Sequence, residues 1–169
     1  MSNSRTKFVF AAAALLTFGS LSFAQTHKTV HLEREKSHLD IYIDIPASAT
    51  VQTFSLGFFH HVDVVSVHLD AESDLGDIYI EEVEHDISFL KEHRKHGLEQ
   101  NFVKYHREGE NDLIVEYKDP LTQKTYYEFH YIREIDGKKY YACSDGNKQY
   151  TLDEVLDMHK IAETLRSKK

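Results

Sequence analysis

The sequence contains few of the residues that define several protein classes. It has one cysteine, two prolines, seven glycines and no tryptophan in 169 residues. A single cysteine cannot form an intrachain disulfide, so a hydrophobic core must hold the fold together. This composition excludes collagen-like and other fibrous proteins. With 41% hydrophobic and 28% charged residues, the chain also differs from an intrinsically disordered one.

Positive charge is scarce as well. Lysine and arginine together number 20 against 28 acidic residues, and the formal net charge is −8. The basic residues form no cluster. Nucleic acids and anionic membranes attract clustered lysine and arginine. We therefore expect neither as the main partner.

The N-terminal segment has the features of a secretory signal peptide. Arg5 and Lys7 precede an apolar run, and Ser22 and Ala24 place small residues at a cleavage site. The run is shorter than the ~20 apolar residues of a spanning helix, which argues against the alternative of a retained anchor. The pattern predicts a signal peptide over residues 1–24 and a single exported domain over residues 25–169. We expect that domain to be periplasmic or secreted, with no membrane span.

Hydrophobic periodicity predicts the secondary structure of the exported part. A helix is expected between Asp86 and Gly97, and a longer one from Leu152 to Leu165, with Thr151 and Glu154 as a capping box. The segment 51–56 is apolar but of uncertain type. Alternating or β-branched runs predict strands over residues 39–45, 62–69, 77–81, 113–117, 125–133 and 139–143.

This order predicts an α+β fold. We expect an antiparallel β-sheet with a short middle helix and a long C-terminal helix packed on it. How residues 25–85 join the sheet is left open by the sequence, as is the oligomeric state.

Two strands near the C-terminus carry residues of special interest. Phe129 should face the core, whereas Glu128 and His130 should share the opposite, charged face, where His130 is expected to be solvated or hydrogen-bonded near Glu128. The tyrosines between residues 126 and 141 fit sheet packing, or alternatively an aromatic recognition surface. Cys143 fits a buried small hydrophobe; a reactive thiol or an intermolecular bridge is the alternative.

The second half of the chain resembles a known family. The relevant stretches are residues 110–114 (ENDLI), 126–129 (YYEF), 136–141 (DGKKYY) and 158–165 (MHKIAETL). They are similar to the PsbP-like and LpqN-like group of small exported α/β domains. The resemblance implies an antiparallel sheet flanked by helices, and a role as an exported accessory factor. It transfers no binding residue.

Histidine is unusually frequent, with 12 in the chain. Neutral imidazole is a common ligand for zinc and copper. His93 and His96 are three residues apart on the expected short helix and can share an ion; His60 and His61 form a second candidate pair. The alternative for each pair is an exposed polar surface without metal.

The histidines also predict a response to acid. Removing residues 1–24 deletes Arg5 and Lys7 and no acidic residue, so the formal charge of −8 becomes −10. Protonation of all 12 histidines near pH 5 would raise it to about +2.

No motif for catalysis is present, such as a Gly-x-Ser-x-Gly elbow or a phosphate-binding loop. We therefore expect an exported, non-enzymatic accessory or binding protein of the bacterial envelope, without a cofactor and with a protein partner. The alternative is a periplasmic protein that binds zinc or copper through histidine clusters.

Overall fold

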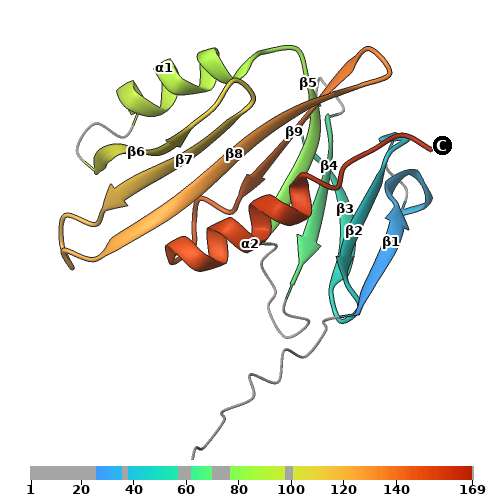
Figure 1. Ribbon diagram of the computed structural model, residues 1–169, viewed down its shortest axis with the longest axis horizontal. Helices are drawn as coiled ribbons and strands as arrows, with labels where there is room; N and C mark the ends of the chain where they lie inside the picture. The colour runs from blue at the N-terminus through green and yellow to red at the C-terminus, as the bar shows by residue number, and fades with distance from the viewer. Residues whose placement is uncertain (1–25, 36–37, 57–61, 70–76, 98–100, 169) are drawn as a thin grey trace, which may run out of the picture.

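The computed structural model describes residues 26–35, 38–56, 62–69, 77–97 and 101–168 (Figure 1). Of these residues, 52% lie in strands and 17% in helices. The elements are β1 (His27–His31), a 3-10 turn η1 (Leu32–Glu35), β2 (Tyr42–Pro46), β3 (Thr50–Leu56), β4 (Val62–His68), β5 (Ile78–Val83), α1 (Ile87–Gly97), β6 (Phe102–Glu108), β7 (Asp112–Lys118), β8 (Thr125–Ile135), β9 (Lys138–Ser144) and α2 (Leu152–Ala162).

The strands form two antiparallel sheets. β1 and β2 make a two-stranded hairpin, and the other seven strands pair in the order β3-β4-β5-β9-β8-β7-β6. Two meanders, β3 to β5 and β6 to β9, therefore meet where β9 pairs with β5. α1 links the meanders, running from the centre of the sheet to its β6 edge (Figure 1).

The large sheet has a hydrophobic cluster on each face. On one face, α2 and the β1–β2 hairpin pack over buried residues such as Ile80 and Phe129. On the other face, Ile87 and Leu90 of α1 pack against Leu113 and Tyr141. Alternate residues of one strand face opposite sides of a sheet, so β7 and β8 contribute to both clusters.

Several sequence-based expectations are confirmed. The alternating residues Leu39, Ile41, Ile43 and Ile45 are all buried, although β2 itself begins only at Tyr42. The short middle helix is present as α1. Asp136 and Gly137 have φ angles of 53° and 81°, the left-handed values of a tight hairpin turn. The sequence did not predict β1 and β6.

The expected fold class is wrong. The described chain is mostly β, and the C-terminal helix is short, so this is not an α+β protein with a long C-terminal helix packed on a sheet. α2 has 11 residues, the same length as α1. The error arises because runs such as β6, which is largely polar and exposed at the sheet edge, carry too weak an apolar pattern to be recognised as strands.

The apolar stripe of α2 continues beyond the helix end, which explains the overestimated length. The capping box at Thr151 and Glu154 is present as expected. At the other end, the Thr164 hydroxyl donates to the Ile161 carbonyl at 2.6 Å, and the chain leaves the helix. Leu165 is still fully buried. It reaches the core from an extended segment rather than from the helix.

The extended segment after α2 is tied to β2. Arg166 exchanges backbone hydrogen bonds with Tyr42, and its guanidinium donates to both carboxylate oxygens of Asp44 at 2.7 and 2.8 Å. The Arg166 guanidinium holds the pKa of Asp44 below its usual value. The C-terminal segment thereby joins the hairpin to the helix.

The prediction that His130 is solvated on the charged face of β8 is also wrong. Glu128 is 2% exposed and His130 is 0% exposed. His130 Nδ1 lies 2.7 Å from the Tyr141 hydroxyl, and Nε2 lies 3.6 Å from a carboxylate oxygen of Glu128. These side chains form a buried polar group, because both faces of this strand are covered in the folded protein.

Candidate metal centre

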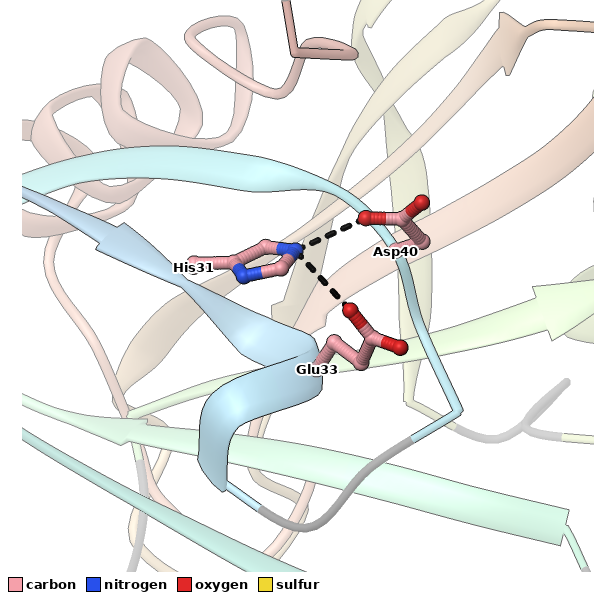
Figure 2. Close-up of side chains that lie close together, drawn as sticks. All are labelled: His31, Glu33 and Asp40. Carbon is pink, nitrogen blue, oxygen red and sulfur yellow. Dashed lines mark hydrogen bonds and ion pairs between the residues drawn. The ribbon is translucent and has the colours of Figure 1, made fainter.

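Three potential metal ligands converge at the end of the β1–β2 hairpin. The Nε2 atom of His31 lies 2.7 Å from Oδ1 of Asp40 and 3.5 Å from Oε2 of Glu33 (Figure 2). In the described part of the chain, only these three residues form a group of histidine, cysteine or acidic donors whose ligand atoms all lie within 4.8 Å. One imidazole and two carboxylates suit divalent transition metals.

The local fold explains this convergence. β1 ends at His31, and the η1 turn reverses the chain so that Glu33 lies beside it. Fully buried Leu32 anchors the turn, and its N–H donates to the Ile41 carbonyl at 3.0 Å. With Ile41 buried, the preceding Asp40 projects to the opposite side, toward His31.

Tyr42 holds the imidazole in place. His31 and Tyr42 are directly opposite in the hairpin register, and their rings stack with centroids 4.4 Å apart and an interplanar angle of 9°. The His31 side chain is only 12% exposed, compared with 57% for Glu33 and 72% for Asp40. The centre thus combines a fixed imidazole with two solvent-facing carboxylates.

This geometry favours an open site rather than a closed structural one. Structural zinc sites usually have four protein ligands, whereas three leave coordination positions for water or another molecule. The His31 Nε2 atom must give up any proton before it can coordinate a metal. Without a metal, the same atom forms a hydrogen bond with Asp40.

Of the four histidines chosen from the sequence, the structure describes the side chain of His93 alone. His93 lies exposed on α1, where its ring packs against Phe89 at 3.9 Å and Nδ1 lies 3.0 Å from the Phe89 carbonyl. His96 is in the same helix, but its side chain is outside the described part, as are His60 and His61. A shared site at these positions stays a prediction.

His159 belongs to a different, buried cluster. Its Nε2 lies 3.2 Å from Asp112 and its Nδ1 lies 3.6 Å from Glu163. Burial lowers the pKa of His159, and Arg107 adds to this effect although both carboxylates oppose it. Arg107 also pairs with Asp112 at 2.7 Å, so we assign this cluster to the packing of α2 on the sheet.

Sequence reasoning missed His31, Glu33 and Asp40. The His-x-Glu spacing was the available signal, but it is short and common. Asp40 becomes a neighbour only when the chain folds back as a hairpin. Glu33 and Asp40 each lie next to a buried leucine in the sequence. Acidic residues in such a pattern are usually exposed to solvent and bind nothing.

No protein-family model, curated protein or solved structure matches the chain. The resemblance to PsbP-like and LpqN-like domains therefore stays a prediction. Among the described residues, no helix is long and apolar enough to span a membrane.

Proposed function

We propose that this chain is an exported, non-enzymatic protein that binds a divalent transition-metal ion, with zinc or copper as the best fit. The convergence of His31, Glu33 and Asp40 within ligand distance of one another supports this proposal. Export rests on the N-terminal pattern of residues 1–24. The proposed ion would be held by one imidazole nitrogen and one oxygen from each carboxylate.

The donor set supports zinc or copper over calcium or magnesium. Calcium takes six to eight oxygen ligands, and magnesium keeps most of its water, whereas imidazole suits zinc and copper. Two carboxylates give the site a charge that attracts a divalent cation. Its exposure allows the ion to exchange with solvent.

Metal binding should stabilise the folded chain. A ligand at 100 times its Kd that binds only the native state adds about 2.7 kcal/mol to the free energy of unfolding. In a domain of this size, that corresponds to a rise in Tm of roughly 5 to 10 °C. We expect zinc and copper, but not calcium or magnesium, to produce such a rise with one ion per chain.

The experiment uses the untagged chain, expressed with its own N-terminus in a bacterial host and purified from the periplasm. Its intact mass shows whether cleavage occurs before Gln25. Isothermal titration calorimetry and thermal unfolding then measure metal binding by the wild type and by His31→Ala and Asp40→Asn variants. We expect both variants to lose the metal-dependent rise in Tm.

Two controls separate this site from other histidines. His38, whose side chain is 93% exposed, pairs with Asp63 alone at 3.6 Å, so His38→Ala should bind metal like the wild type. The double variant His93→Ala, His96→Ala tests the alternative pair on α1. Unchanged binding by His31→Ala, with loss in the double variant, would move the site to α1.

A further inference from the structure

A second, unrelated site lies beside α2. A hollow of about 360 Å³ lies between α2, the end of β2 and the start of β5. It is on the side of the large sheet that α2 covers, and Figure 1 shows where these elements lie. Its volume falls within the range of about 300 to 1,000 Å³ typical of small-molecule sites. The lining residues are Pro46, Leu69, Asp77, Tyr150, Glu154, Asp157, Met158 and Ile161.

The hollow combines an apolar floor with acidic walls. Pro46, Met158 and Ile161 are buried residues at its base. Of the eight described residues that line it, three are acidic and none is lysine, arginine or histidine. The nearest cation on α2, Lys160, lines the adjoining hollow with His27 and Thr164 instead. The charged residues in the described lining are therefore all acidic, and the lysines that pair with Asp77 and Asp157 lie outside it.

The three carboxylates differ in how fully they are neutralised. Asp77 is 8% exposed; it accepts from Lys148 Nζ at 2.9 Å and from the Leu69 N–H at 2.7 Å. Glu154 Oε2 accepts from both the backbone N–H and the hydroxyl of Thr151. Asp157 has only an exposed pair with Lys160, which water screens. Glu154 and Asp157 thus supply the available negative charge.

A bare metal ion does not fit these walls. In the described residues, the carboxylate oxygens of this hollow do not converge to within 4.8 Å as those around His31 do. A hydrated ion would also leave the apolar floor unused. A ligand with a positive group and an apolar body satisfies both features, because its body covers the floor while its charge lies near the acidic rim.

We propose that this hollow binds a small organic cation, an amine with a short apolar body. The ammonium group lies near Glu154 and Asp157, and the body contacts Met158, Ile161 and Leu69. Tyr150, which is 8% exposed, also lines the hollow, and aromatic side chains attract cations. This site is independent of the proposed metal centre.

Hexylammonium is a suitable probe, with 1-hexanol and hexanoate as matched neutral and anionic controls. Amide and methyl NMR shifts of the full chain are followed at pH 7 as each probe is added. We expect saturable shifts at Leu69, Met158 and Ile161 with hexylammonium, at about millimolar Kd. Hexanol should bind several-fold more weakly and hexanoate more weakly still.

Charge variants on α2 complete the experiment. Glu154→Gln keeps the capping geometry, and together with Asp157→Asn it should weaken hexylammonium binding about three- to tenfold. Asp153→Asn removes one negative charge from the same helix at a residue outside the described lining of the hollow, and should change binding little. His31→Ala should leave it unchanged.

Three results would overturn the proposal. Equal affinities for hexanol and hexylammonium would make the hollow a purely apolar one. Equal effects of Asp153→Asn and the double variant would show general attraction to an acidic surface. Binding of a lysine-rich peptide without any binding of hexylammonium would assign the acidic rim to a protein partner.

Discussion

Asp112 shows how a single residue can connect several elements. Its carboxylate pairs with Arg107 at 2.7 Å and lies 3.2 Å from His159, and its side chain is 10% exposed. Gly109 lies against the same carboxylate: a Cβ added at Gly109 would overlap Oδ1 of Asp112. The missing side chain at Gly109 therefore provides the space that Asp112 occupies.

We predict that Gly109→Ala destabilises the protein. The added methyl group displaces a carboxylate that is largely buried and already paired, and breaking such a network costs about 1 to 3 kcal/mol. Urea unfolding of the variant and wild type measures the change. Gly146→Ala is the control, because its Cβ would meet Glu128 Oε1 at an ordinary 3.6 Å and its effect should be small. A stable Gly109→Ala would show that Asp112 moves freely.

At the scale of the element, α2 packs on β8 through a titratable residue. The His159 side chain is 2% exposed, and its ring meets those of Phe129 and Tyr131 edge-on. Asp112 and Glu163 favour its charged form, while burial and Arg107 favour the neutral one. Burial is the largest effect, so the pKa of folded His159 is below the usual 6.5.

This shift predicts a loss of stability in mild acid. Because the pKa is lower in the folded state, the unfolded chain takes up the proton first as the pH falls. Stability therefore decreases as the pH falls below about 6.5, until the folded pKa is passed. Replacing His159 by Leu removes the imidazole that takes up a proton on unfolding. The free energy of unfolding should then depend less on pH between 7 and 5.

Denaturant unfolding at several pH values checks this prediction. His38→Leu, which replaces a histidine whose side chain is 93% exposed, is the control variant. If His159→Leu and the wild type lost stability in parallel, titration of His159 would not contribute to the pH dependence of folding.

At the scale of the whole molecule, burial changes the titration of two of the described histidines. His85 and His159 both have pKa values lowered mainly by burial, and His93 and Lys139 lower that of His85 further. A net charge calculated from all 12 histidines as ordinary imidazoles therefore becomes positive at too high a pH. The protein should therefore carry less positive charge near pH 5 than the composition indicates.

Potentiometric titration of the folded chain tests this expectation. Between pH 6.5 and 5.5, a variant with His85→Gln and His159→Leu should differ from the wild type in proton uptake by less than two ordinary imidazoles would, because burial lowers the pKa of both histidines. Two imidazoles of pKa 6.5 would take up about 0.8 proton over this range, so a deficit of that size would show that both histidines titrate as they do in an unfolded chain.

The local parts of the fold were predictable from the sequence. Alternation identified the buried face of residues 39–45, the Asp136-Gly137 pair identified its hairpin turn, and Thr151 with Glu154 identified the start of α2. Each of these patterns depends on residues close together in the chain. Spacing alone contains that information.

The tertiary structure decided the rest. The end of α2, the pairing of β9 with β5 and the burial of His130 each depend on segments distant in the sequence. The candidate metal centre likewise required the hairpin to bring Asp40 to His31. Local spacing determines which residues face the core and which cap a helix. Strand pairing between distant segments determines which side chains contact one another, and burial determines which of them stay charged.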